Sequence, residues 1–210
     1  MALLRVEDLT VRRGTRTVLE NYNLEIGSGE CVLLIGENGS GKSTLIEAIA
    51  GILPIQSGSI ELKRPFGLTL QSGGFNGDEI VNERLEFAAQ ATGVVEQNVL
   101  QHWNLSHRGQ DRIGHLSGGL HRRLSVIQGL LPAYGEEVRI CLLDEPSEGL
   151  DEESVQTLMS DISSLRARGH SFLIATHDNR LRECATRLQV LDEDASTNEP
   201  TVEAGDAPLF

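Results

Sequence analysis

Residues 36–44, GENGSGKST, have the types and spacing of a loop that binds phosphate, Gly36-x-x-x-x-Gly41-Lys42-Ser43. Glycines let backbone N–H groups turn toward phosphate oxygens with no Cβ in the way. Lys42 can reach the β- and γ-phosphates of a nucleotide, and the Ser43 hydroxyl can ligate Mg²⁺. The alternative is a glycine-rich turn without a ligand. Lys42 is one of only two lysines in the chain, which favours a specific role.

Phosphate chemistry also needs an acid beside the loop, and the segment RICLLDEP supplies two. Asp144 follows an apolar run and can hold Mg²⁺ through water. Glu145 comes next and can polarise the water that attacks the phosphate. The alternative is that both acids belong to an ordinary turn before Pro146. The phosphate loop at 36–44 makes the functional interpretation the stronger one.

The surrounding residues predict elements that would position both motifs. The run at 31–35 is short, apolar and followed by glycine, as is typical of a buried parallel strand. Residues 42–51 have helical spacing that ends at Gly51. Other buried strands are predicted near 138–144, 171–176 and 187–192, and other helices at 117–131 and 151–169. This alternation indicates an α/β domain with a mainly parallel sheet, whose ligands bind at the carboxyl ends of strands.

Two smaller parts and a tail complete the predicted organisation. Residues 2–26 alternate between apolar and polar in two pieces, which predicts an N-terminal antiparallel β subdomain. Residues 72–116 are predicted to be an inserted helical subdomain, with amphipathic helices at 79–93 and 95–105 and no strand between them. Together these form one domain at 1–192. Residues 193–210 are acidic and are predicted to be a flexible or loosely attached tail.

Composition limits the classes of partner. The chain has 31 acidic against 18 basic residues and a net charge of −13, so nucleic acid is not an expected partner. Its three cysteines form no C-x-x-C pair and are expected to be reduced, as in an intracellular protein. We find no signal peptide and no apolar run near the ~20 residues that span a bilayer. A partner that crosses the membrane remains compatible with these features.

The segment LSGGLHRR opens a predicted helix about 25 residues before DEP. It resembles the signature motif of the ATP-binding cassette (ABC) ATPases, a family of P-loop NTPases. The resemblance covers residues 2 to about 192, and the motifs occur in the family's order. It implies ATP as substrate with Mg²⁺ as cofactor, and it implies an ATP-binding role for Gly36, Glu37, Asn38, Gly39, Ser40, Gly41, Lys42, Ser43 and Thr44.

The same resemblance implies roles for residues outside the loop. Gln71 would touch Mg²⁺ and the attacking water, so that Ser43, Gln71 and Asp144 form the metal site. His177, in IATHD, would be the switch histidine that contacts the γ-phosphate, and would act with Glu145 and Gln71 in catalysis. The motif at 147–151, SEGLD, would be the D-loop with its Asp151.

The signature implies a homodimer. Ser117 and the backbone N–H groups of Gly118 and Gly119 would form an anion site at a helix N-terminus. In the family this site faces the γ-phosphate that the other subunit holds, so two ATP molecules are enclosed between two subunits. Hydrolysis then removes the group that joins them.

Two positions depart from the family pattern. Leu120 stands where the signature usually ends in glutamine, which predicts weaker closure of the dimer. The segment at 11–14, where the family carries an aromatic that stacks on adenine, has none. We hypothesise that Arg13 lays its guanidinium plane on the base. The alternative is a solvated arginine of the hairpin.

The resemblance favours a transporter subunit on the cytoplasmic face of the cell membrane, driving a separate integral membrane permease. The permease would dock near residues 72–92, a region that loosely resembles export-type subunits. The alternative is a soluble ABC ATPase of iron–sulfur cluster assembly. A regulatory cassette without turnover is disfavoured, because Lys42, Glu145 and His177 are all present. The sequence does not indicate the transported substrate.

Overall fold

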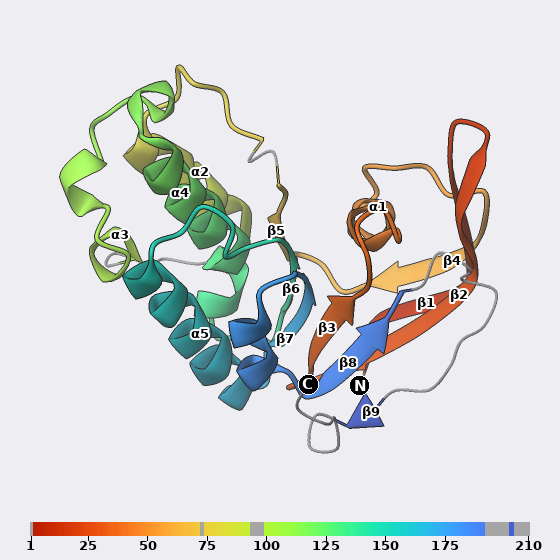
Figure 1. Cartoon of the computed structure of the whole chain (residues 1–210). Coiled ribbons are helices and arrows are strands. Elements are labelled where there is room, and N and C mark those ends of the chain that lie inside the picture. Colours follow the sequence, from red (N-terminus) through yellow and green to blue (C-terminus); the bar gives the residue numbers. More distant parts are fainter. Residues whose placement is uncertain (1, 72–73, 93–98, 192–201, 204–210) are drawn as a thin grey trace.

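The N-terminal part is an antiparallel sheet. The computed structural model describes residues 2–71, 74–92, 99–191 and 202–203 of the chain. Strands β1 (Ala2–Arg13) and β2 (Arg16–Gly27) form the predicted hairpin, and β4 (Ser57–Leu62) pairs with the other edge of β1. Gly14 turns the hairpin with a positive φ of 60°, a conformation that glycine adopts without strain. This sheet lies on the right of Figure 1.

The central sheet carries the chemistry predicted above, and it is parallel except at one edge. Its order is β5-β6-β7-β3-β8-β9, with β9 antiparallel to β8. The strands are β5 (Gly67–Thr69), β6 (Ile140–Asp144), β7 (Ser171–Ala175), β3 (Cys31–Ile35), β8 (Arg187–Val190) and β9 (Val202–Glu203). The predicted α/β class with a mainly parallel sheet and an antiparallel subdomain is confirmed. Most of the predicted acidic tail lies outside the described residues.

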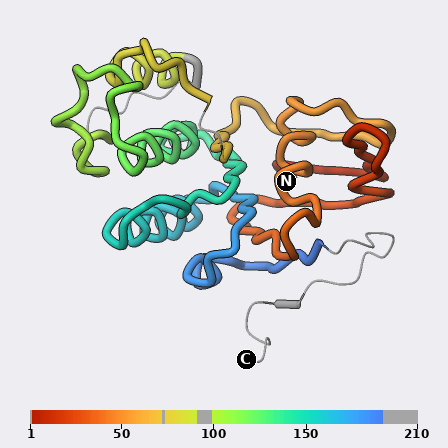
Figure 2. The backbone as a smooth tube through the Cα atoms, turned by 45° about the horizontal axis from the view of Figure 1, so that its top comes forward, coloured from red at the N-terminus to blue at the C-terminus, as the bar shows by residue number. Residues whose placement is uncertain are grey.

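Two hydrophobic cores lie on the two faces of the central sheet. Along β3, Cys31 and Leu33 face one core, whereas Val32 and Leu34 face the other. The first core is closed by α2 (Val81–Thr92), α3 (Val99–His102), α4 (Gly118–Leu130) and α5 (Glu152–Ala167). The second is closed by the N-terminal sheet and α1 (Lys42–Ile49). Figure 2 shows the helical region and the N-terminal sheet at opposite ends of the molecule.

The helical region between β5 and α4 differs from its prediction in one element. We predicted a helix over 95–105, but α3 ends at His102, and Asn104 has a positive φ of 50°. Beyond it, the Asn104 N–H donates to the Gln101 carbonyl at 3.0 Å, and the Leu105 N–H donates to the Leu100 carbonyl at 2.7 Å. This is a Schellman-type helix end with asparagine in the left-handed position, and it leaves Trp103 only 2% exposed. Residues 95–98 lie outside the described residues. Short 3₁₀ turns follow at η1 (Ser106–Arg108) and η2 (Ile113–His115), and further ones at η3 (Leu131–Tyr134) and η4 (Asn179–Cys184).

Helix α4 contacts β5 backbone to backbone. A Cβ on Gly67 would lie 1.8 Å from the carbonyl oxygen of Gly129. A Cβ on Gly129 would lie 1.9 Å from Oγ1 of Thr69, whose hydroxyl donates to the Ser125 carbonyl at 3.2 Å. Since neither glycine can take a side chain without displacing the helix, the end of α4 is seated directly on the sheet edge.

A buried carboxylate joins the helical region to α5. Asp161 is 6% exposed and accepts hydrogen bonds from the Trp103 indole at 3.1 Å and the Tyr134 hydroxyl at 2.6 Å. His102 Nε2 lies 2.8 Å from its other oxygen. Trp103 and His102 belong to the helical region, whereas Asp161 lies on α5. The cluster therefore fixes the two parts together through polar contacts as well as apolar packing.

We expect Asp161→Ala to lower the free energy of unfolding by about 2–4 kcal/mol, because the buried Tyr134 hydroxyl loses its acceptor and the Trp103 indole keeps only the Tyr134 oxygen at 3.1 Å. Urea denaturation followed by far-UV circular dichroism measures the change. Asp111→Ala is the matched control, since it removes a surface ion pair with Arg108 and should cost less than about 1 kcal/mol. Equal losses in the two variants would contradict the role given to the cluster.

Candidate functional site

The loop at 36–44 connects the end of β3 to the start of α1, at the carboxyl edge of the parallel sheet. Gly36 cannot be replaced without movement, because a Cβ there would lie 2.1 Å from the Leu191 carbonyl oxygen. Lys42 is 7% exposed, and its Nζ donates to the carbonyls of Gly36 and Glu37 at 2.8 and 2.9 Å. Burial lowers the pKa of Lys42 from its ordinary value, while the carboxylates of Glu145 and Asp144 act the other way. The ammonium thus lies inside the loop.

A pocket of about 470 Å³ opens over this loop. Four segments that are far apart in sequence form its wall. They are the β1–β2 hairpin, the phosphate loop with the start of α1, the segment after β5 and the segment after β7. The lining residues are Arg13, Arg16, Val18, Asn38, Gly39, Gly41, Lys42, Ser43, Thr44, Gln71 and His177. The hydroxyl of Ser40 is buried beside the loop without a hydrogen-bond partner among the described residues. The pocket therefore combines a backbone cradle with a single buried ammonium, a donor set suited to phosphate.

Asp144, at the end of β6, contacts the phosphate loop through Ser43. It is the last residue of β6, is 3% exposed, and its Oδ1 accepts from the Ser43 hydroxyl at 3.1 Å. Burial is the main cause that raises its pKa, and the Ser43 hydrogen bond opposes it. The two residues are 101 positions apart in sequence. A hydroxyl and a carboxylate in contact at the edge of a phosphate pocket are oxygen ligands of the kind that Mg²⁺ prefers.

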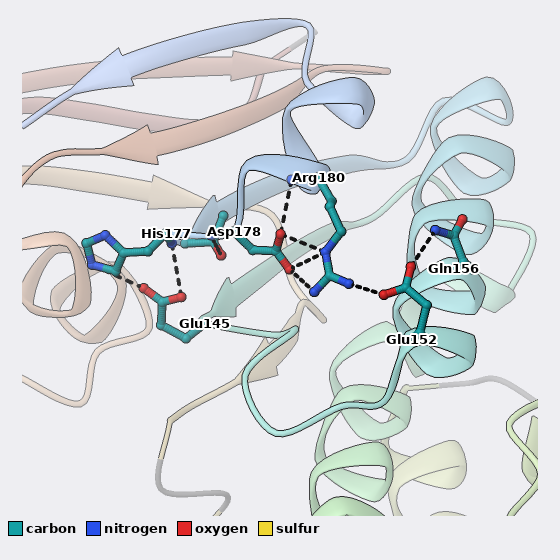
Figure 3. A network of polar contacts seen from close by, with 7 residues as sticks. Glu145, Glu152, Gln156, His177, Asp178 and Arg180 are labelled. Atoms are coloured by element: carbon teal, nitrogen blue, oxygen red, sulfur yellow. Dashed lines mark hydrogen bonds and ion pairs between the residues drawn. The ribbon is translucent and has the colours of Figure 1, made fainter. Parts of the chain in front are cut away.

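Glu145 and His177 face each other at the ends of β6 and β7 (Figure 3). The His177 backbone N–H donates to Glu145 Oε2 at 3.2 Å, and His177 Nε2 lies 3.6 Å from Oε1. The backbone of Glu145 is in the left-handed region, with φ of 47°, and its N–H donates to the Ala175 carbonyl at 2.8 Å. The carboxylate is thereby aimed at His177, which itself lines the pocket.

The signature and D-loop residues lie outside this pocket. Ser117 is the N-cap of α4, accepting from the Leu120 N–H at 3.4 Å, and Gly118 and Gly119 form the first turn. Asp151 caps α5 by accepting from the Ser154 N–H at 3.0 Å, and its other oxygen pairs with Arg123. Gln71 lines the pocket, although its amide donates to Glu148 Oε2 at 3.1 Å. Within one chain, the predicted anion site on α4 therefore has no access to the phosphate loop.

The comparison with known proteins identifies the family. The family model described as "ABC transporter" matches residues 19–148, which include the phosphate loop, the signature, Asp144 and Glu145. This chain belongs to the ABC transporter family. It is an ABC-type ATPase domain with the P-loop NTPase fold, as the motifs predicted. Asp151 and His177 lie beyond the matched residues.

Curated relatives of this ABC cassette include both exporters and an importer. The chain is 34% identical over 214 residues to the macrolide export ATP-binding/permease protein MacB of Vibrio parahaemolyticus, covering 89% of this chain and 32% of MacB. It is 31% identical over 198 residues to the putative HMP/thiamine import ATP-binding protein YkoD of Bacillus subtilis, covering 86% of this chain and 35% of YkoD. The cassette therefore spans about a third of the length of these two relatives.

Solved structures agree on the architecture. The chain matches the structure of an ATP-binding subunit of an ABC transporter with a TM-score of 0.85, 25% identity, and coverage of 96% of this chain and 90% of that one. It matches a dimeric ATP-binding cassette in a post-hydrolysis state bound to ADP and Pi with a TM-score of 0.81 and 20% identity. That match covers 96% of this chain and 98% of the other. At this identity the second likeness supports the fold alone.

The two departures from the family pattern have structural settings. Leu120 is half-buried and packs against the first core, so an apolar side chain suits its position on α4. Arg13 lines the pocket, where its Nε donates to the Thr44 hydroxyl at 3.0 Å and its Nη2 pairs with Glu47. Arg13 therefore lies beside the phosphate loop, although 48% of its side chain remains exposed to solvent.

Sequence reasoning missed a chain of polar contacts behind His177 (Figure 3). Asp178 holds Arg180 through two pairs of atoms at 2.9 and 2.7 Å, and Arg180 Nη1 pairs with Glu152. Glu152 is the first residue of α5 and follows Asp151, so the contacts join the switch histidine loop to the D-loop. The signal in the sequence was weak: an aspartate after a strand end, with a donor two residues later, is a common turn.

Proposed function

We propose that this ABC ATPase domain binds ATP in the pocket over residues 36–44 and drives an integral membrane permease, for export, as one half of a homodimer. One observation carries the proposal. Ser43, His177 and Lys42 line a single pocket, in which Ser43 contacts Asp144 and His177 faces Glu145. This places a phosphate cradle, oxygen ligands and a candidate base around one volume.

In the proposed mechanism the loop orients the phosphates of ATP. Backbone N–H groups of the loop and the N-terminus of α1 donate to the phosphate oxygens. Lys42 exchanges its hydrogen bonds to the Gly36 and Glu37 carbonyls for contacts with the β- and γ-phosphates. Because the ammonium is already buried, binding of ATP costs little further desolvation of the Lys42 charge. The charge then acts on the phosphates at a low effective dielectric constant.

The residues present fit Mg²⁺. Ser43, Gln71 and Asp144 would hold the ion, since the Ser43 hydroxyl and the Asp144 carboxylate are already in contact and Gln71 lines the same pocket. When bound, Mg²⁺ neutralises charge on the phosphates of the nucleotide.

Glu145 is the proposed base, and His177 contacts the γ-phosphate. The carboxylate of Glu145 polarises the attacking water and accepts its proton as the bond to the γ-phosphorus forms and ADP leaves. The hydrogen bond from the His177 backbone N–H keeps the carboxylate beside the imidazole. The base is thereby held next to the residue proposed to contact the γ-phosphate.

A second copy is needed to complete the site. Ser117, Gly118 and Gly119 lie outside the lining of the pocket, although their N–H groups open a 13-residue helix. Facing the γ-phosphate of a partner, they would bind it at the positive end of the helix dipole. This arrangement supports an ATP-dependent homodimer, closed by two shared nucleotides.

The permease is proposed as a separate chain on the membrane, with this protein on its cytoplasmic face. Among the described residues, no helix has the length and apolar character needed to cross a bilayer. The proposed docking region, near residues 72–92, includes α2, whose Phe87 is 66% exposed. The relatives described above include a macrolide exporter and a putative HMP/thiamine importer, so the proposed direction of transport rests on the loose export-type likeness at 71–93.

The test is purification of the tagged chain from gently solubilised membranes of its native cell. Recovery of a multi-span protein with it would support the transporter proposal and would indicate the class of cargo. A chain that remains wholly in the soluble fraction, with soluble partners, would contradict transport and would favour iron–sulfur cluster assembly.

Arg13→Ala tests the proposed adenine contact. We expect the Kd for ATP to rise about two- to fivefold, the effect of losing an exposed guanidinium stacked on an aromatic ring. Titration of a fluorescent ATP analogue measures it. The matched control is Arg12→Ala, because Arg12 donates to the Thr15 carbonyl and does not line the pocket. An unchanged Kd in the Arg13 variant would exclude the stacking role.

A further inference from the structure

Arg122 is a buried cation on α4 that reaches three backbone carbonyls. It lies four residues after the signature glycine Gly118 and is 8% exposed. Its Nη1 donates to the Leu70 carbonyl at 2.9 Å, and its Nη2 donates to the Asp144 carbonyl at 2.8 Å. The same Nη2 also donates to the carbonyl of Glu145. A planar, rigid fork is the side chain suited to acceptors on two different strands.

These three carbonyls lie at the ends of two strands, next to or within the residues proposed for catalysis. Leu70 directly precedes Gln71, and the other two carbonyls belong to Asp144 and Glu145 themselves. Leu70 and Glu145 lie just beyond the ends of β5 and β6, and the guanidinium supplies a buried donor to both of their carbonyls and to that of Asp144. Burial lowers the pKa of Arg122, while Glu148, Asp144 and Glu145 oppose this, and an arginine remains charged in either case.

The backbone of Glu145 needs such support. A residue with a side chain at a φ of 47° costs on the order of 1–3 kcal/mol relative to an ordinary conformation, and persists only when its surroundings fix it. Its N–H is held by the Ala175 carbonyl, and its own carbonyl accepts both from Arg122 and from the Glu148 N–H at 3.0 Å. Without the guanidinium, only the short turn contact from Glu148 holds this carbonyl. The backbone can then relax and turn the carboxylate away from His177.

We infer that Arg122 is a positioning residue, which holds the Glu145 backbone in its left-handed conformation and links the signature helix to Gln71 and Asp144. The inference rests on the proposed ATPase mechanism. Because the guanidinium contacts neither the phosphate loop nor the pocket lining, it should affect the rate of the chemical step and leave ATP binding almost unchanged.

Arg122→Met and Arg122→Lys test the inference through kcat and KM for ATP, with Arg139→Met as the matched control. Arg139 is also buried, at 9% exposure, and also donates to a backbone carbonyl, that of Arg64 at 3.3 Å. We expect Arg122→Met to lower kcat at least tenfold with KM within threefold of wild type. Arg122→Lys should recover part of kcat. Arg139→Met should lower Tm and leave kcat within twofold.

Several outcomes would overturn the inference. A kcat within twofold of wild type in Arg122→Met would do so, as would a raised KM with an unchanged kcat. If Arg139→Met lowered kcat as much as Arg122→Met does, the fall in kcat would be a general result of losing a buried arginine. Should Arg122→Met fail to fold, Arg122→Gln replaces it, with the same expected fall in kcat. Lack of turnover by the wild-type chain would instead contradict the proposed function, which separates the two failures.

Discussion

Glu145→Gln should reduce the rate of ATP hydrolysis by about two to four orders of magnitude and leave ATP binding intact. The loss of a positioned general base accounts for a fall of this size. Glutamine keeps the shape of glutamate, and its carbonyl oxygen can still accept the hydrogen bond from the His177 N–H, so the pocket should not rearrange. Phosphate release under saturating ATP and Mg²⁺ measures the rate.

The same variant tests the dimer. With hydrolysis blocked, ATP stays between the two subunits, so a species of twice the mass should accumulate on a sizing column in the presence of ATP and Mg²⁺. Glu153→Gln is the matched control, because Glu153 is exposed in the first turn of α5, away from the pocket. A rate within tenfold of wild type would remove Glu145 from the role of base. A Glu145→Gln variant that remains monomeric would count against the enclosed-ATP mechanism.

Lys42→Met should weaken ATP binding by about 10- to 150-fold, the effect of losing charge-assisted hydrogen bonds of about 1.5–3 kcal/mol. Methionine retains most of the apolar length of the side chain but cannot donate to phosphate. In the nucleotide-free chain it removes a buried charge but also the donor to the Gly36 and Glu37 carbonyls, so the two effects on stability oppose each other. Isothermal titration of ATP measures the Kd, and thermal unfolding without nucleotide checks the fold.

The chain supplies its own control for this experiment. Lys63 is the only other lysine, and it follows β4, at the edge of the N-terminal sheet. Lys63→Met changes net charge by the same amount and should leave the Kd unchanged. If the Kd of Lys42→Met stayed within threefold of wild type, Lys42 would not bind phosphate. Its ammonium would then serve only to hold the loop through the Gly36 and Glu37 carbonyls.

The phosphate loop was predictable because its chemistry is local. Glycines, lysine and serine must follow one another at fixed spacing between a strand and a helix, so the sequence at 36–44 carries the signal by itself. The parallel sheet was predictable for a similar reason, since strands buried on both faces are continuous apolar runs.

Arg122 was not predictable, because its partners are distant in sequence. The acceptors of Arg122 lie 22 to 52 residues away, and nothing near the helix indicates them. The end of α3 does have a local signal, since Asn104 takes the left-handed position there, and the helix predicted at 95–105 ran past it. The pairing of His177 with Glu145 across 32 residues, by contrast, follows only from the adjacency of β6 and β7.

The close contact of Gly67 and Gly129 fixes the C-terminal end of α4 on the sheet, so a tilt of the helix about this contact moves its N-terminal end the most. The signature at Gly118 stands 11 residues from that contact, which is roughly 16 Å along a helix that rises about 1.5 Å per residue. A tilt of about 5° about the glycine contact would therefore carry Ser117, one residue further away, through roughly 1.6 Å, enough to make or break a hydrogen bond to phosphate. Small rotations at the sheet edge are thus amplified at the surface that would meet a second subunit.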